Sequence, residues 1–211
     1  MNEKNMWVKV HAYVSADGMI SNWLCKDIHG KKLRIRKRFS RVRFYNQNAE
    51  LIKDYIEAIK IICPHLSYIR HIQHRNEVDI RSQILAKGLL KLGDISTKSW
   101  QIPKDLSNRQ KRIWARAFAD CDGTVGYYNY DRYVSVDSIN LKGLKQLVNL
   151  LNDLGITSRI QKVVYKENES YRLRIYRKEN LFRYYKLVGF THPKKQEKLS
   201  QAIQSYKLPA V

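Results

Sequence analysis

The spacing of apolar residues predicts that the first part of the chain alternates helices with pairs of short strands. A helix over residues 7–17 comes first, and basic strands follow it. In residues 48–63, apolar side chains recur three and four positions apart, which predicts a helix that Asn48 begins and Pro64 ends. Short strands at 68–74 and 77–81 and a helix at 82–92 complete this part.

The second part of the chain repeats the same order of elements. Its first helix is predicted at 108–122, where Ser107 and Gln110 have the spacing of a capping box. Strands are expected at 127–130, 133–136, 160–165 and 171–177, and helices at 140–154, at 179–188 and from Pro193 onward. A duplicated helix–hairpin–helix–hairpin–helix unit is the economical interpretation. A linker at 100–104 divides an N-terminal half, residues 1–100, from a C-terminal half, residues 101–211.

Two of the predicted strand regions carry rows of cations. In residues 31–44 and again in 171–177, arginine and lysine alternate with apolar residues, which predicts strands with one apolar and one basic face. A single strand of this kind is more often a solvated surface strand. Two copies favour a nucleic-acid-binding sheet, because arginine side chains on an exposed face can reach phosphates and guanine edges.

The charge balance supports this interpretation. The 211 residues include 40 Lys and Arg against 19 Asp and Glu, a net charge of +21. A hydrophobic fraction of 44% excludes a disordered basic tail, since a packed core is possible. Small acidic substrates do not require so much positive charge spread over a chain, whereas a polyphosphate does. Nucleic acid is therefore the expected partner.

The cysteines and the apolar runs predict an intracellular protein. Cys25, Cys63 and Cys121 are odd in number and widely spaced, which excludes a disulfide framework and a four-cysteine zinc site and fits a reducing compartment. No run approaches the ~18–20 apolar residues of a membrane span, and no secretory signal pattern is found at the start. We expect the cytoplasm of a prokaryote or an organelle, without secretion or a membrane partner.

The first helix of each half has the same design. Small residues recur four positions apart, Ala12 and Ala16 in one helix and Ala117 and Cys121 in the other, so that another backbone can approach closely. Each helix ends in Asp-Gly, at residues 17–18 and 122–123. The glycines are expected to adopt the left-handed conformation that ends a helix.

The two terminal aspartates, Asp17 and Asp122, point to divalent cations. A carboxylate at the C-terminal end of a helix is disfavoured by the helix dipole, and two of them brought together repel each other. An isolated Asp-Gly after an apolar helix is ordinarily only a capped turn. Two copies at equivalent places in a duplicated chain favour a site in which cations lie between the acids.

These segments resemble the paired signature of the LAGLIDADG homing endonucleases in their single-chain form with two motifs. The sequence AFADCDG at 117–123 is the closer match, and AYVSADG at 12–18 has drifted at its start. The resemblance extends to residues 44–51, 100–103, 137–156 and 189–195, and it covers nearly the whole chain.

The resemblance implies an α+β fold, a pseudo-twofold pair of αββαββα units. Their antiparallel sheets form a saddle across the DNA major groove, and the motif helices form the interface. Asp17 and Asp122 would bind two or three Mg²⁺ ions beside the scissile phosphates, with the backbone carbonyls of Ala16 and Cys121 as further ligands. The resemblance implies hydrolysis of both strands by one protein chain acting as a monomer.

Other site residues follow from the same resemblance. Asn46 and Ser138 occupy the turn before the second helix of each half, where the family places a polar residue that organises solvent. A basic residue is expected near the metals, with Lys162 and Arg75 as candidates from strand position. Asp120 is expected to lie off the metal, because Ser15 takes its place in the first motif.

The basic sheets are expected to read the DNA. The candidate groove contacts are Arg34, Arg36, Arg38, Arg41, Arg43, Tyr128, Tyr130, Arg132, Arg172 and Arg174. Lys194, Lys195 and Lys198 are interpreted as backbone clamps or solvated residues. Three functions remain open: an intron-encoded DNA endonuclease, a maturase that binds intron RNA, and a DNA-binding regulator that does not cleave. Two facing carboxylates without a bound metal would be costly to keep, so the presence of both acids argues against the regulator but not against the maturase.

Overall fold

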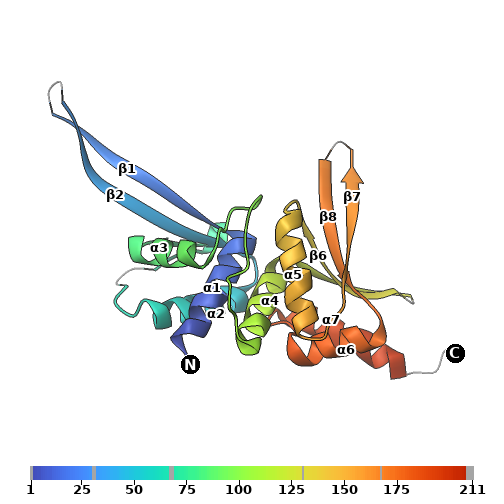
Figure 1. The fold of residues 1–211 in the computed structure, drawn as a ribbon. Coiled ribbons are helices and arrows are strands. Elements are labelled where there is room, and N and C mark those ends of the chain that lie inside the picture. Colours follow the sequence, from blue (N-terminus) through green and yellow to red (C-terminus); the bar gives the residue numbers. More distant parts are fainter. Residues whose placement is uncertain (1, 30–31, 67–68, 130, 167, 208–211) are drawn as a thin grey trace.

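The computed structural model describes residues 2–29, 32–66, 69–129, 131–166 and 168–207. The N-terminal half is a four-stranded antiparallel sheet in the order β1-β2-β4-β3 with helices packed against it (Figure 1). Its elements are α1 (Glu3–Asp17), β1 (Gly18–His29), β2 (Lys32–Tyr45), α2 (Ala49–Ile62), β3 (Arg70–Ile72), a 3₁₀ turn (Gln73–Arg75), β4 (Glu77–Arg81) and α3 (Gln83–Leu92).

The C-terminal half repeats this topology with its strands in the order β5-β6-β8-β7. Its elements are α4 (Asn108–Asp122), β5 (Gly123–Tyr128), β6 (Asp131–Ser138), α5 (Leu141–Asp153), β7 (Arg159–Tyr165), β8 (Asn168–Ile175), α6 (Lys178–Leu187), α7 (Pro193–Gln204) and a 3₁₀ turn (Ser205–Lys207). The predicted duplication and the α+β class are confirmed. The exact division into residues 1–100 and 101–211 stays a prediction.

The helix starts follow the sequence signals. The side chain of Asn48 accepts hydrogen bonds from the backbone N–H groups of Glu50 and Leu51, and Ser107 and Gln110 form the expected capping box. Pro193 lies in the first turn of α7. The strand predicted at 127–130 is wrong at its start, because β5 begins at Gly123 directly after α4 without an intervening turn.

The motif glycines differ from the expectation. Gly18 has φ −130° and ψ −179°, and Gly123 has φ −82° and ψ 152°, so both are extended and not left-handed. Glycine is required for space instead. A Cβ at Gly18 would lie 2.6 Å from the Cα of Val14, and one at Gly123 would lie 2.3 Å from the carbonyl oxygen of Ala119. Each strand therefore leaves the last helical turn at a distance that only glycine allows.

Replacing Gly123 with alanine is expected to lower the free energy of unfolding by about 2 kcal/mol or more, because backbone atoms must shift to admit the Cβ. Thr124→Ala, at an exposed position of the same strand, is the control and should change stability by less than about 0.5 kcal/mol. Urea unfolding monitored by circular dichroism measures both. Equal stability of the two variants would contradict this explanation of the glycine.

The core is centred on α1 and α4, which lie side by side between the two sheets (Figure 1). Ala12 and Ala117 are buried at their packed faces, and this fits the predicted close approach of two small-residue stripes. The indole N–H of Trp114 donates to Nδ1 of His11, 3.2 Å away, which ties the two helices together. Burial lowers the pKa of His11 to about 4, so this imidazole is neutral at physiological pH.

The helices in the described ranges are too short or too polar to cross a lipid bilayer. Among the cysteines, Cys63 and Cys121 are free thiols.

Candidate active site: paired acids between the two halves

Asp17 and Asp122 are the last residues of α1 and α4, and both are half-buried where these helices end between the two sheets (Figure 1). Burial and, as the second cause, the negative charge of Asp17 raise the pKa of Asp122 from its ordinary value of 3.8 to about 7. The two helix ends meet at Asn46, whose amide nitrogen lies 2.8 Å from Oδ2 of Asp17 and 3.9 Å from Sγ of Cys121, the residue before Asp122. The helices that carry the two acids pack side by side, as expected, and the shared site of the acids stays a prediction.

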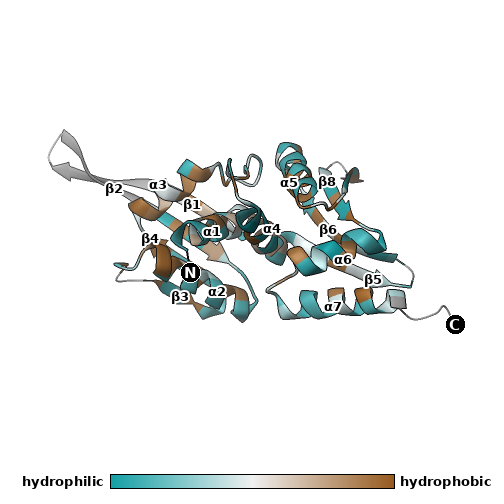
Figure 2. Cartoon of the chain, turned by 60° about the horizontal axis from the view of Figure 1, so that its bottom comes forward, coloured by the Kyte–Doolittle hydropathy of each residue, from teal (hydrophilic) through white to brown (hydrophobic). Residues whose placement is uncertain are grey.

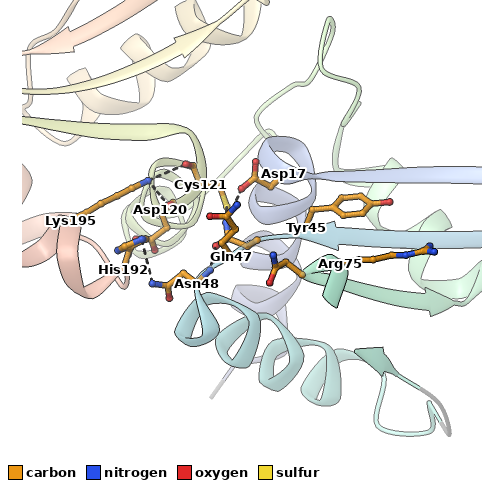
Figure 3. A pocket seen from close by; sticks show the side chains of 11 residues that line it. Asp17, Tyr45, Gln47, Asn48, Arg75, Asp120, Cys121, His192 and Lys195 are labelled. Atoms are coloured by element: carbon orange, nitrogen blue, oxygen red, sulfur yellow. Dashed lines mark hydrogen bonds between the residues drawn. The ribbon is translucent and has the colours of Figure 1, made fainter. Parts of the chain in front are cut away.

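Asp17 is held by the turn that precedes α2. The amide nitrogen of Asn46 donates to Oδ2 of Asp17 at 2.8 Å, and the amide oxygen of Asn46 accepts from the backbone N–H of Asn48 at 2.9 Å (Figure 3). The second contact fixes which end of the amide faces the acid. Burial raises the pKa of Asp17, and the hydrogen bonds from Asn46 and Cys121 oppose that rise. Asn46 therefore favours the ionised form of Asp17.

Ser138, at the equivalent turn of the C-terminal half, has different contacts. The indole N–H of Trp100 donates to its hydroxyl oxygen at 3.2 Å, and the backbone N–H of Asn140 donates to the same atom at 3.1 Å. Within the described residues, Ser138 has no hydrogen bond with Asp122. The two halves of the site are therefore unequal. The amide of Asn46 contacts Asp17 directly, whereas the hydroxyl of Ser138 accepts hydrogen bonds from Trp100 in the linker and from Asn140 at the start of α5.

Lys195 is a basic residue beside the acids. From the first turn of α7, its ammonium group donates to the carbonyl oxygens of Ala119 at 3.3 Å, Asp120 at 2.6 Å and Cys121 at 3.0 Å (Figure 3). Burial lowers the pKa of Lys195, and its positive charge lowers the pKa of both Asp17 and Asp122. Lys195 therefore compensates the negative end of α4.

The two candidates for a basic residue near the metals lie elsewhere. Lys162 is exposed on β7 and forms an ion pair with Glu169 at 2.5 Å. Arg75 lines the outer part of the pocket that contains Asp17 and makes no contact with either acid among the described residues. Lys195 lies in the first turn of α7, where a positive charge is disfavoured by the helix dipole. This unfavourable position could have indicated from sequence that Lys195 has an anionic or carbonyl partner.

Asp120 lines the same pocket as Asp17 but is bound to the segment before α7; its expected place off the metal stays a prediction. Its Oδ1 accepts from the backbone N–H groups of Thr191 at 2.8 Å and His192 at 3.0 Å, just before α7. Burial raises the pKa of Asp120 to about 6. Asp120 thus anchors the start of α7, which in turn carries Lys195 to the site.

An open pocket of about 430 Å³ is lined by Asp17, Asp120 and the residues that contact them (Figure 3). It joins the turn before α2, represented by Asn46, to α4 and α7, represented by Cys121 and Lys195. His192 closes the far side, where its Nε2 lies 3.4 Å from the side-chain nitrogen of Asn48. Lys195, His192 and Trp100 were missed as site residues because their partners lie far away in sequence.

The donor set fits a hard divalent cation. The two carboxylates supply hard oxygen ligands, which suit Mg²⁺, since this ion keeps several waters and uses substrate phosphates for the rest of its coordination. The carbonyl oxygen of Cys121, an expected further ligand, accepts from the ammonium group of Lys195 at 3.0 Å in this structure. The described residues contain no group of three or more His, Cys, Asp and Glu side chains that would form a complete protein cage. Ala16 precedes Asp17 as Cys121 precedes Asp122, so its carbonyl remains the equivalent candidate.

The arginines of the sheets are held in place by carboxylates. On β2, Arg41 and Arg43 lie on the face opposite the buried Val42 and Phe44, and they approach Asp79 at 3.0 Å and Glu77 at 3.5 Å. This pairing across strands holds both guanidinium groups on the face opposite the buried core residues of β2.

The C-terminal sheet has the same arrangement on β8. Arg172 donates two hydrogen bonds of 2.7 Å to Asp137. Arg174 stacks on Tyr133, 3.9 Å from the ring centroid, and its guanidinium is 3.7 Å from Asp131. Arg159, which sequence analysis did not select, pairs in register with Arg174 and is exposed on the same face.

Arg132 is a correction to the expected DNA contacts. It shares a face with the buried Val134, and it donates to the hydroxyl of Ser205 at 2.6 Å and stacks on Tyr206 at 4.6 Å, on the side covered by α7. Tyr128 is 79% exposed at the end of β5 and can still reach a ligand. Tyr130 and the side chains of Arg34, Arg36 and Arg38 lie outside the described residues.

Comparison with known proteins identifies the fold. Residues 109–189 match the family model of the LAGLIDADG-like domain. The chain has the fold of the LAGLIDADG homing endonucleases. Its structure is similar to that of I-DmoI in complex with DNA and Ca, with a TM-score of 0.69 and 14% identity over 95% of this chain and 100% of that chain.

Two further structures share the LAGLIDADG fold of this chain. I-LtrWI, a LAGLIDADG homing endonuclease bound to target DNA, has a TM-score of 0.63 and 14% identity over 98% of this chain and 92% of that chain. Full-length DUF199/WhiA from Thermatoga maritima has a TM-score of 0.59 and 12% identity over 100% of this chain and 63% of that chain. The expected pair of αββαββα units with the LAGLIDADG helices between them is confirmed.

Proposed function

We propose that this protein is a site-specific homing endonuclease that binds a long double-stranded DNA site and hydrolyses both strands with the help of divalent metal ions. The observation that carries the proposal is the pair of acids, Asp17 and Asp122, which end the two packed helices α1 and α4, one from each half. Facing carboxylates destabilise the metal-free protein, so cation binding is the function that best explains them. The DNA-bound structures of I-DmoI and I-LtrWI support duplex DNA as the partner.

Each residue of the site then has a distinct role. Asp17 and Asp122 hold the cations, and the carbonyls of Ala16 and Cys121 extend the ligand set. When bound, Mg²⁺ lowers the pKa of an attacking water and stabilises the leaving oxygen. Asn46 orients Asp17 through its 2.8 Å hydrogen bond. Lys195 keeps the last turn of α4 in place while the acids gain and lose cations.

Recognition would come from the arginines that the sheets hold on their open faces. Arg41, Arg43, Arg172 and Arg174 have carboxylate partners that pre-organise them, and DNA phosphates or guanine edges can take up their remaining donors. One chain with two unlike halves suits a pseudosymmetric duplex site and action as a monomer. We further propose that the reading frame lies within an intron.

The fold alone does not establish cleavage, because one fold hosts many functions. With Mg²⁺, the purified protein should therefore cut DNA in which the exons flanking its reading frame are joined, and with Ca²⁺ it should bind that DNA without cutting. If it binds only the intron RNA, with a salt-dependent affinity, the maturase replaces the endonuclease as the function. Failure to bind either nucleic acid would contradict both.

The unequal turns give a paired test. Asn46→Ala removes the amide that orients Asp17 and is expected to slow cleavage about ten- to a hundredfold. Ser138→Ala removes only an acceptor for Trp100 and Asn140, so it should lower stability by about 1 kcal/mol and slow cleavage by less than about threefold. Single-turnover cleavage and urea unfolding of both variants measure this. Equal loss of cleavage would show that both turns act alike on the acids.

A further inference from the structure

A second pocket runs along the two central helices, from their first turns toward the middle of each. It has a volume of about 390 Å³ and is lined by α1 from Met6 to Tyr13, by α4 from Arg109 to Ala117, by the end of α6 and by Thr191. Arg109, in its lining, is 13 residues before Asp122 on α4, which is about 20 Å along a helix at 1.5 Å per residue. We call it the helix-end pocket. Its outer end at Arg109 and Arg112 is the part that lies far from the acids, whereas Ala117 at its inner end is only five residues before Asp122.

The lining of the helix-end pocket is strongly basic. Five cations line it, Lys9, Arg109, Arg112, Arg116 and Lys186, and no carboxylate does. Three of the five have partners within the protein: Lys9 pairs with Asp54 at 2.8 Å, Arg116 donates to the carbonyl of Val188 at 2.5 Å, and Lys186 lies 4.5 Å from the ring of Phe182.

The remaining two arginines have no structural role in the described part of the chain. Arg109 and Arg112 are exposed, and neither has a hydrogen bond or ion pair with the residues described. Both lie in the first turns of α4, which contain no acidic residue, so their charges add to the positive end of the helix dipole. This placement costs stability and favours an external anion.

The remaining walls of the pocket are partly apolar. Met6, Ile113 and Leu187 line it beside the cations, so it offers a hydrophobic surface within reach of two guanidinium groups. Figure 2, in which the bottom of the molecule comes forward, shows α4 and α6 largely hydrophilic around this region. An apolar wall inside a basic rim is complementary to a nucleotide, whose base is flat and apolar on its faces and whose phosphate is anionic.

We propose that the helix-end pocket binds a nucleotide unit of single-stranded nucleic acid. Arg109 and Arg112 would contact phosphates, and an unstacked base would lie against Met6, Ile113 and Leu187. A duplex keeps its bases stacked and cannot insert one into a pocket without unpairing it. The apolar residues line a hollow, whereas membrane binding requires them to protrude from a helix face. This second site does not depend on cleavage at the paired acids.

The test uses fluorescence anisotropy with short oligouridylate and oligothymidylate probes on the full chain. The variant Arg109→Ala with Arg112→Ala removes the two unpaired cations and should fold, since alanine is a strong helix former. The matched control is Lys87→Ala with Lys91→Ala, which removes the same charge from exposed positions of α3. A third variant, Arg172→Ala with Arg174→Ala, tests the sheet face.

The arginine variant of α4 is expected to bind single strands about ten- to thirtyfold more weakly and to lower the salt slope by about 1.4, because each phosphate contact on a single strand contributes about 0.7 to that slope. Its affinity for duplex DNA should stay within about threefold of wild type. The proposal is overturned if the α3 control loses as much, if only the sheet variant loses affinity, or if anionic phosphatidylserine vesicles bind the protein through these arginines while the oligonucleotides do not.

Discussion

Asp122→Asn is expected to slow cleavage of both DNA strands by at least about a thousandfold, which corresponds to about 4 kcal/mol of lost transition-state stabilisation. The substitution keeps the shape of the side chain but removes the charge that holds the cations. Asp17→Asn should have an effect of the same order, because the two carboxylates serve one site. The measurement is the single-turnover rate on joined-exon DNA with Mg²⁺, alongside a gel-shift affinity.

Asp120→Asn is the control for this pair of variants. It lies two residues before Asp122, and its Oδ1 contacts to Thr191 and His192 can be kept by the oxygen of asparagine. Cleavage should therefore stay within about threefold of wild type, and DNA affinity should be similar in all three variants. If Asp122→Asn cuts as fast as wild type, or if Asp120→Asn is equally inactive, the assignment of the acids is wrong.

The Asp122→Asn substitution should also stabilise the metal-free protein at high pH. Because folding raises the pKa of Asp122 from 3.8 to about 7, the folded state binds the proton more tightly than the unfolded state. The stabilising contribution of the protonated acid is fully present below pH 3.8 and is lost as the pH rises through about 7. A shift of about three units corresponds to at most about 4 kcal/mol. We expect about half of that, because the carboxylate is only half-buried.

At pH 8 in EDTA, Asp122→Asn should therefore be about 2 kcal/mol more stable than wild type, and the difference should disappear near pH 4. Urea unfolding across this range measures it. Glu57→Gln, at an exposed position of α2, is the control and should show no such trend. Added Mg²⁺ should stabilise wild type at pH 8 and not the variant. A variant that is less stable than wild type at pH 8 would show that the acid is satisfied without a metal.

The element order and the place of the acids could be predicted from sequence because their causes are local. The helix at 108–122 is marked by its own capping residues, Ser107 and Gln110, and the small residues four apart indicate which helices pack together. The duplication then assigns both aspartates to one site. Helix ends and the apolar or small-residue faces of helices depend on residues within one or two turns, so they can be predicted from the local sequence.

The contacts that distinguish the two halves could not be predicted, because their partners are distant in sequence. Lys195 reaches carbonyls some 75 positions earlier, and Trp100 reaches Ser138 across 38 positions. Arg132 was expected to contact the DNA groove, but the sequence did not reveal that its side chain binds Ser205, which lies more than 70 positions later. The motif glycines were assigned a special backbone angle, whereas the packed helix end requires the absence of a Cβ.

The most direct measurement is the binding of Mn²⁺ by isothermal titration calorimetry, on wild type and on the two single variants, each saturated with DNA of the joined-exon site. If the acids from the two halves share their cations, Asp17→Asn and Asp122→Asn will each weaken binding by at least about tenfold, because each removes a charged ligand from the same site. If either variant binds Mn²⁺ as tightly as wild type, the two halves do not form a common metal site.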